Sequence, residues 1–136
     1  MNISKELIAN LAKSGAMLPQ EEMLEVKKVK GDLYLGIPKE TSFQETRVAL
    51  TPPAVAVLVN NGHRIVVETN AGVSASFQDK DYSDAGAQIA YSKEDVFNAD
   101  IILKVAPPSI EELMLIKRKQ TLISALNIRI QNENYF

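Results

Sequence analysis

From Asp32 onward, short strand-like runs alternate with runs of helical periodicity, and this alternation constrains the fold more than any other feature of the sequence. The strand-like runs cover residues 32–37, 64–69, 87–91, 99–105 and 120–126. β-Branched residues dominate the second run, and the fourth is largely apolar, as expected of a strand covered on both faces. Strands that alternate with helices form βαβ units. The sequence therefore predicts an α/β domain with a mostly parallel sheet and helices on both faces.

Helix signals fill the gaps between these strands. Residues 51–62 begin with a capping threonine and a first-turn proline and end on a glycine, which predicts a helix. A short helix is expected over 79–86, and another of one to two turns after Ser92. Residues 109–112 form a capping box, so we expect a helix from there to about Lys119.

Residues 1–30 precede the alternating pattern. Ser4 can cap an amphipathic helix that ends near Gly15, and a second short helix is expected to open at Pro19. We therefore expect a helical N-terminal arm, residues 1–30, before a domain of residues 31–136. The apolar stripe of such an arm is expected to pack against the domain or a partner subunit.

Composition excludes several functions. Fifteen Lys and Arg face seventeen Asp and Glu, so the basic excess of a nucleic-acid-binding protein is missing. No apolar run reaches the roughly 18 residues needed to span a membrane, and the first residues lack the apolar core of a signal peptide, so we expect a cytoplasmic protein. With no cysteine and only His63, disulfides and a zinc site of nitrogen and sulfur ligands are excluded. His63 is expected to be structural or solvated.

The carboxyl ends of the strands form the edge at which open parallel sheets bind ligands, and two candidates fall there. Segment 38–50 is much longer than a usual strand-to-helix loop and carries Arg47, whose guanidinium suits a carboxylate. The alternative for Arg47 is an ion pair with a loop glutamate.

Lys104, near the end of run 99–105, is the second candidate. A buried ammonium needs a partner, and desolvation favours the neutral amine, which suits proton transfer or carbonyl polarisation. Its alternative is a side chain that reaches solvent at the strand end. The chain has no GxGxxG turn, so we expect no cofactor-binding residue within it and, alone, a folded domain without catalytic activity.

Two blocks, Gly36–Glu40 and Glu45–Pro52, followed by Asn61–His63, are similar to the N-terminal signature of a known family. That family comprises the alanine dehydrogenases and the alpha subunits of nicotinamide nucleotide transhydrogenase. The resemblance continues to about Leu126 and is stronger to the alanine dehydrogenases. It implies a Rossmann-like or flavodoxin-like three-layer substrate domain, incomplete at residue 136, that precedes a separate NAD-binding Rossmann domain.

The resemblance also implies an activity: reversible oxidative deamination of L-alanine to pyruvate and ammonia by a homo-oligomeric enzyme, with hydride transfer to NAD. Arg47 matches the arginine that binds the substrate carboxylate. Lys104 matches the catalytic lysine that contacts the 2-oxo oxygen.

One position departs from the family pattern. Alanine dehydrogenases carry a catalytic histidine after the fifth strand, whereas Leu126 is followed here by Asn127. An asparagine can orient substrate but cannot serve as acid or base. This leaves two alternatives: the alpha subunit of a proton-translocating transhydrogenase, and a catalytically silent module with the same fold.

Overall fold

The computed structural model describes residues 31–127 and residue 133. The chain divides into two units, Met1–Gly31 and Asp32–Phe136, and the fold described here belongs to the second. The helices expected within residues 1–30, which make up the predicted arm, lie outside the described residues.

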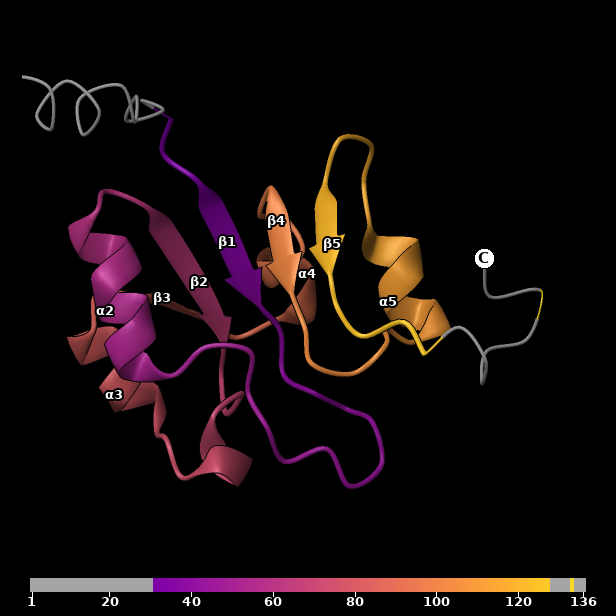
Figure 1. Ribbon diagram of the computed structural model, residues 1–136, viewed down its shortest axis with the longest axis horizontal. Helices are drawn as coiled ribbons and strands as arrows, with labels where there is room; N and C mark the ends of the chain where they lie inside the picture. The colour runs from indigo at the N-terminus through magenta and orange to yellow at the C-terminus, as the bar shows by residue number, and fades with distance from the viewer. Residues whose placement is uncertain (1–30, 128–132, 134–136) are drawn as a thin grey trace, which may run out of the picture. The chain divides into compact units, whose positions relative to one another are not determined.

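Five strands form one parallel sheet with the order β3-β2-β1-β4-β5. In Figure 1 the arrows of β1, β2, β4 and β5 point toward one edge, where the long loop after β1 also lies. The parallel sheet predicted from the alternating pattern is confirmed, although each of the five strands is shorter than the strand-like run that predicted it. The strands are β1 (Tyr34–Ile37), β2 (Arg64–Glu68), β3 (Gln88–Ala90), β4 (Ile101–Leu103) and β5 (Thr121–Ile123).

The helices α2 (Pro52–Asn60), α3 (Asp79–Asp84), α4 (Lys93–Val96) and α5 (Ile110–Leu115), with the 3₁₀ turn η1 (Val73–Ala75), connect the strands. Two of the predicted caps are present: the Ser92 hydroxyl accepts a hydrogen bond from the Asp95 backbone N–H, and α5 opens with a capping box. Thr51 stands at the N-cap of α2, but its side chain makes no capping hydrogen bond. After α2, Gly62 adopts φ +90°, a conformation that glycine tolerates best.

The expectation that α5 continues to Lys119 is wrong. The helix ends at Leu115 because Ile116 has an extended backbone, with φ −71° and ψ 130°. Leu115 and Ile116 both pack against the second apolar cluster.

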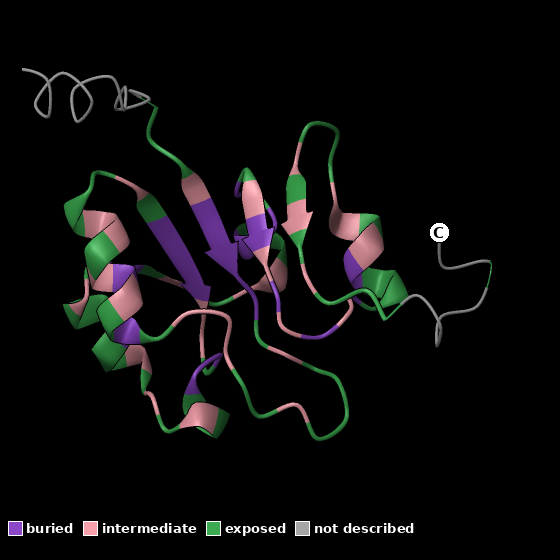
Figure 2. Cartoon of the chain, viewed as in Figure 1, coloured by how far each residue is buried: buried purple, intermediate pink, exposed green. Residues whose placement is uncertain are grey.

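The sheet is the middle layer of three, and its alternating residues feed two apolar clusters. Ile65 and Val67 of β2 pack with Val55 of α2 and Tyr82 of α3. Val66, between them, faces the opposite cluster, which includes Val96 of α4. Figure 2 shows the buried residues concentrated along β1, β2 and β4. Helices therefore cover both faces, as predicted.

No helix among residues 31–127 and 133 is long and apolar enough to cross a membrane.

Candidate functional site

Lys104 directly follows β4, and its side chain is only 1% exposed. The strand end is held in place because the Lys104 backbone N–H donates to the Ile123 carbonyl of β5 at 2.9 Å. The ammonium nitrogen lies 3.0 Å from Glu40 Oε2 and 3.2 Å from Glu112 Oε2. The alternative in which this side chain reaches solvent is therefore wrong, and Lys104 is a buried cation with two anionic partners.

Glu40 connects the loop after β1 to the end of β4. One carboxylate oxygen accepts a hydrogen bond from Lys104 Nζ, and the other accepts from the Val105 backbone N–H at 2.6 Å. The side chain of Glu40 is 4% exposed. The carboxyl ends of two adjacent strands are thus joined by one buried carboxylate.

Two further residues extend this arrangement toward β2. Lys93, at the start of α4, places its ammonium 2.7 Å from Glu112 Oε1 and 4.0 Å from Glu68 Oε2. Glu68 in turn accepts a hydrogen bond from the Lys39 backbone N–H at 2.7 Å. We call these groups the edge charge network. It consists of three carboxylates and two ammonium groups, a net charge of −1: Glu40, Glu68, Lys93, Lys104 and Glu112.

Glu112 is the shared member of the network and is 2% exposed. Burial by itself raises the pKa of Glu112. Hydrogen bonds from Lys93 and the Ser109 backbone, with the charges of Lys104 and Lys93, outweigh that effect and lower the pKa below its ordinary value. Glu112 is therefore a carboxylate at neutral pH and an effective partner for both ammonium groups.

Arg47 lies in the same long loop as Glu40, but its side chain is 74% exposed. Its guanidinium donates to both oxygens of Glu45, at 2.9 Å from Nε and 2.8 Å from Nη2. Hydrogen bonds from Arg47 lower the pKa of Glu45 to about 2. The pKa of Arg47 is raised, first by Glu45 and in smaller part by the charge of Glu40.

Arg47 therefore forms the loop ion pair that was the alternative to substrate binding. Within residues 31–127, the two cations contact different carboxylates: Arg47 contacts Glu45, whereas Lys104 contacts Glu40 and Glu112. Glu40 interacts with both cations. Its carboxylate forms an ion pair with Lys104, and its negative charge contributes to the raised pKa of Arg47.

Asn127 is exposed and has φ +49°, a left-handed conformation that asparagine tolerates better than most residues. The segment that leads to it runs beside the end of β4, where the Ala125 backbone N–H donates to the Val105 carbonyl at 3.3 Å. The segment that contains Asn127 therefore leaves β5 at the same edge of the sheet as Lys104.

Sequence reasoning missed most of the network. Glu112 was recognised only as a capping residue, a role that the structure confirms through its bond from the Ser109 backbone N–H. The available signal was Lys104 itself, because a buried ammonium requires an anion nearby. Sequence alone cannot say which carboxylate supplies it.

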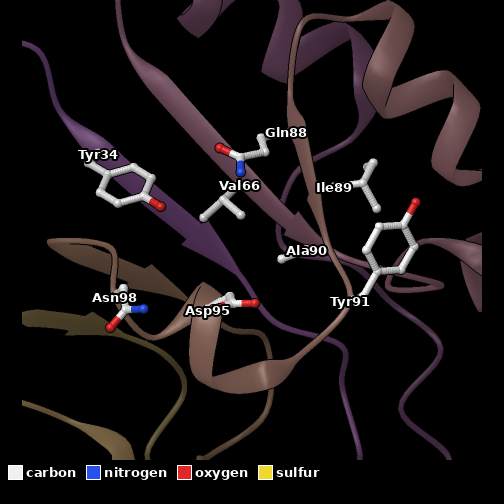
Figure 3. A pocket seen from close by; sticks show the side chains of 8 residues that line it. All are labelled: Tyr34, Val66, Gln88, Ile89, Ala90, Tyr91, Asp95 and Asn98. Atoms are coloured by element: carbon white, nitrogen blue, oxygen red, sulfur yellow. The ribbon is translucent and has the colours of Figure 1, made fainter.

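A pocket of about 400 Å³ opens elsewhere, between β3 and α4 over β2 (Figure 3). Its lining includes Tyr34, Gln88 and Asp95 but no member of the edge charge network. His63 is structural, as expected, because its Nδ1 accepts a hydrogen bond from the Leu33 backbone N–H at 3.3 Å. In the part of the chain that the structure describes, no group of acidic or histidine side chains is arranged to hold a metal ion.

Residues 36–135 match the family described as alanine dehydrogenase/PNT, N-terminal domain. The chain belongs to this family. It is 38% identical over 101 residues to the alanine dehydrogenase of Bacillus subtilis (strain 168), covering 74% of the chain and 27% of that relative. It is 40% identical over 96 residues to the alanine dehydrogenase of Staphylococcus saprophyticus, covering 71% and 26%.

Two solved structures share the fold of this N-terminal domain. An L-alanine dehydrogenase superposes with a TM-score of 0.70 at 39% identity, over 73% of this chain and 27% of the other. A transhydrogenase from Sinorhizobium meliloti gives 0.63 at 34% identity, over 66% and 26%. The family resemblance and the three-layer α/β fold predicted from sequence are both confirmed. The chain spans about a quarter of the length of these relatives.

Proposed function

We propose that this chain is the N-terminal substrate-binding part of an NAD-dependent alanine dehydrogenase. The reaction converts L-alanine, NAD and water to pyruvate, ammonia and NADH. The observation that carries the proposal is the buried Lys104 ammonium at the carboxyl edge of the sheet, in a chain whose curated relatives are named alanine dehydrogenases.

In this proposal Arg47 binds the substrate carboxylate and Lys104 contacts the 2-oxo oxygen. Arg47 is suited to its role because its guanidinium is exposed and can form a bidentate contact with a ligand carboxylate. Lys104 is suited because a cation enclosed by protein polarises a carbonyl more strongly than one in water. Asn127 then orients the substrate without exchanging a proton.

Substrate access requires a change in the loop after β1. Glu40 covers Lys104 in the present structure, and Glu40 and Arg47 belong to the same loop, residues 38–50. A small 2-oxo acid that bridges Arg47 and Lys104 must therefore displace the carboxylate of Glu40. We expect loop movement to accompany binding.

We expect the residues that the structure describes to contribute little to NAD binding. The turn after β1, where many dinucleotide-binding domains place a glycine-rich phosphate loop, is replaced by the long segment 38–50 before α2. We therefore propose that NAD is held mainly by a Rossmann domain after residue 136. A homo-oligomeric assembly and a cytoplasmic location complete the proposal, and both stay predictions.

The alternative is the alpha subunit of a proton-translocating transhydrogenase. Asn127 favours it, because passing hydride between nucleotides needs no acid–base group for a small substrate. The likeness to the Sinorhizobium meliloti transhydrogenase is compatible with it. A catalytically silent module of the same fold is the third reading.

The test uses the complete enzyme, in which this chain is joined to its nicotinamide domain. We expect L-alanine and NAD to yield reduced cofactor, and the 136-residue chain alone to yield none because the cofactor is not positioned. Arg47→Ala should raise the KM for pyruvate about 10- to 100-fold, the equivalent of a lost charged hydrogen bond. Lys104→Ala should lower both turnover and affinity.

Arg118→Ala is the matched control, because Arg118 is also exposed but lies in the loop before β5, at the amino edge of the sheet. Unchanged kinetics in the Arg47 and Lys104 variants would remove both residues from the site. Hydride transfer between nucleotides without alanine oxidation would establish the transhydrogenase alternative. Absence of both activities would leave the silent module.

A further inference from the structure

We propose that Glu45 is a positioning residue that holds the Arg47 guanidinium by one edge and leaves its other edge open to receive the substrate carboxylate. The inference rests on the proposed function, in which Arg47 binds that carboxylate. The ion pair and the substrate then use different edges of the same guanidinium, so the one does not exclude the other.

Glu45 binds Arg47 along the edge that Nε and Nη2 form. Nε donates to Oε1 at 2.9 Å, and Nη2 donates to Oε2 at 2.8 Å. A guanidinium has five N–H donors, one on Nε and two on each terminal nitrogen, and this contact uses two of them. Among the described residues, Nη1 donates to no protein group. Nη1 and the second N–H of Nη2 therefore form a free edge that matches the two oxygens of a carboxylate.

The two partners of this ion pair differ in exposure. The Arg47 side chain is 74% exposed, whereas the Glu45 side chain is 11% exposed. Solvent therefore reaches the guanidinium far more than the carboxylate that holds it. A ligand carboxylate can reach the free edge of Arg47 without displacing Glu45.

The backbone around the pair is also held in place. Oε1 of Glu45 accepts a hydrogen bond from the Arg47 backbone N–H at 3.0 Å, so one carboxylate fixes both ends of the arginine. The Glu45 backbone N–H donates to the Ser42 carbonyl at 3.1 Å and closes a turn in which Gln44 has φ 59°. This left-handed conformation is uncommon outside glycine, and such strain is concentrated at functional sites. An exposed ion pair contributes little to stability, so stability alone does not explain why the turn is kept.

Two opposite effects of Glu45 on substrate binding can be compared. A ligand that must itself order a free arginine side chain binds about 2- to 10-fold more weakly, and Glu45 removes this cost. The charge of Glu45 also repels the substrate carboxylate. For exposed charges about 6 Å apart, that repulsion weakens binding by less than about twofold at physiological salt and is almost fully screened at about 1 M salt. Positioning therefore outweighs repulsion, and loss of Glu45 should weaken binding.

The experiment measures KM and kcat for pyruvate in the complete enzyme at about 1 M salt. Glu45→Gln should raise the KM about 2- to 10-fold and leave kcat unchanged, because it alters binding and not the chemical step. In an enzyme that already carries Arg47→Ala, Glu45→Gln should leave the KM unchanged, because Glu45 acts through the guanidinium. Glu111→Gln is the matched control. Glu111 is an exposed glutamate in the first turn of α5 and pairs with no cation among the described residues, so its KM should equal that of the wild type.

An unchanged KM in Glu45→Gln would overturn the positioning role, and a lower KM would show instead that Glu45 competes with the substrate for Arg47. An equal rise in the Arg47→Ala enzyme would also overturn it, because the effect would then be a general one on the fold. If Glu45→Gln fails to fold, Glu45→Ala is the second variant and should raise the KM at least as much. A wild-type enzyme without alanine oxidation would refute the proposed function, whereas normal oxidation with an unchanged KM in Glu45→Gln would refute only this inference.

Discussion

Substitution of Gly36 in β1 tests how tightly α4 is packed on the sheet. A Cβ at this position would lie 2.5 Å from the Val96 carbonyl oxygen and 3.0 Å from Ala99 Cβ. Carbon–oxygen contacts are usually about 3.3 Å or longer, so α4 must retreat by roughly 0.8 Å. Overpacking of this kind costs about 1–3 kcal/mol, and the lower chain entropy of alanine offsets about 0.5–1 kcal/mol. Because the obstructing atom belongs to the backbone, we expect Gly36→Ala to lower the free energy of unfolding by about 1–2 kcal/mol.

Urea unfolding of the chain measures this difference, with Gly31→Ala as the control. A Cβ on Gly31 meets nothing within 4 Å, so that variant should stay within about 0.5 kcal/mol of the wild type. Equal stability of the two variants would refute the close packing of α4 on the backbone of β1. The same displacement would also move Lys93, the first residue of α4, away from Glu112.

Two other predictions concern single contacts. The carboxyl group of Glu45, followed by carbon NMR, should titrate near pH 2 and return to about 4.5 in Arg47→Ala. Since the folded-state pKa of Glu45 is depressed, the stabilisation from this pair is complete above about pH 4.5 and is lost as the pH falls toward 2. A titration midpoint of Glu45 near pH 4.5 in the wild type would contradict the bidentate contact. Tyr82→Phe should lower the free energy of unfolding by about 1–2 kcal/mol in urea, because the Tyr82 hydroxyl donates to the Leu50 carbonyl at 2.9 Å; an unchanged midpoint would show that water satisfies that carbonyl.

The sequence predicts the sheet well because strand formation here follows a local pattern. In β2, Ile65 and Val67 place apolar side chains on one face of the sheet and Val66 places one on the other. This pattern is expected of a parallel strand that is covered on both faces. Helices between consecutive strands then force the parallel direction. Lys104 was identifiable for a related reason, since a charged residue beside a buried strand stands out against its apolar neighbours.

The partners of these residues could not be predicted, because they depend on distances between segments far apart in the chain. Glu40 is 64 residues from Lys104, and Lys93 is 19 residues from Glu112. The end of α5 was missed for a different reason. Its capping box predicts where the helix begins, whereas no glycine or proline in the sequence marks its end at Leu115.

The edge charge network also bears on which ligand the site can accept. Its net charge is −1, counting Glu40, Glu68 and Glu112 against Lys93 and Lys104. Displacement of Glu40 with its loop would leave two carboxylates and two ammonium groups, a net charge of zero. Under the proposed function, a monoanionic 2-oxo acid that enters there brings one negative charge, but its carboxylate pairs with Arg47 and only its 2-oxo oxygen contacts Lys104. A neutral ligand would leave Lys104 with one anionic partner fewer, which is unfavourable for a buried ammonium. We therefore expect an anionic ligand to bind at this edge more tightly than a neutral molecule of the same size.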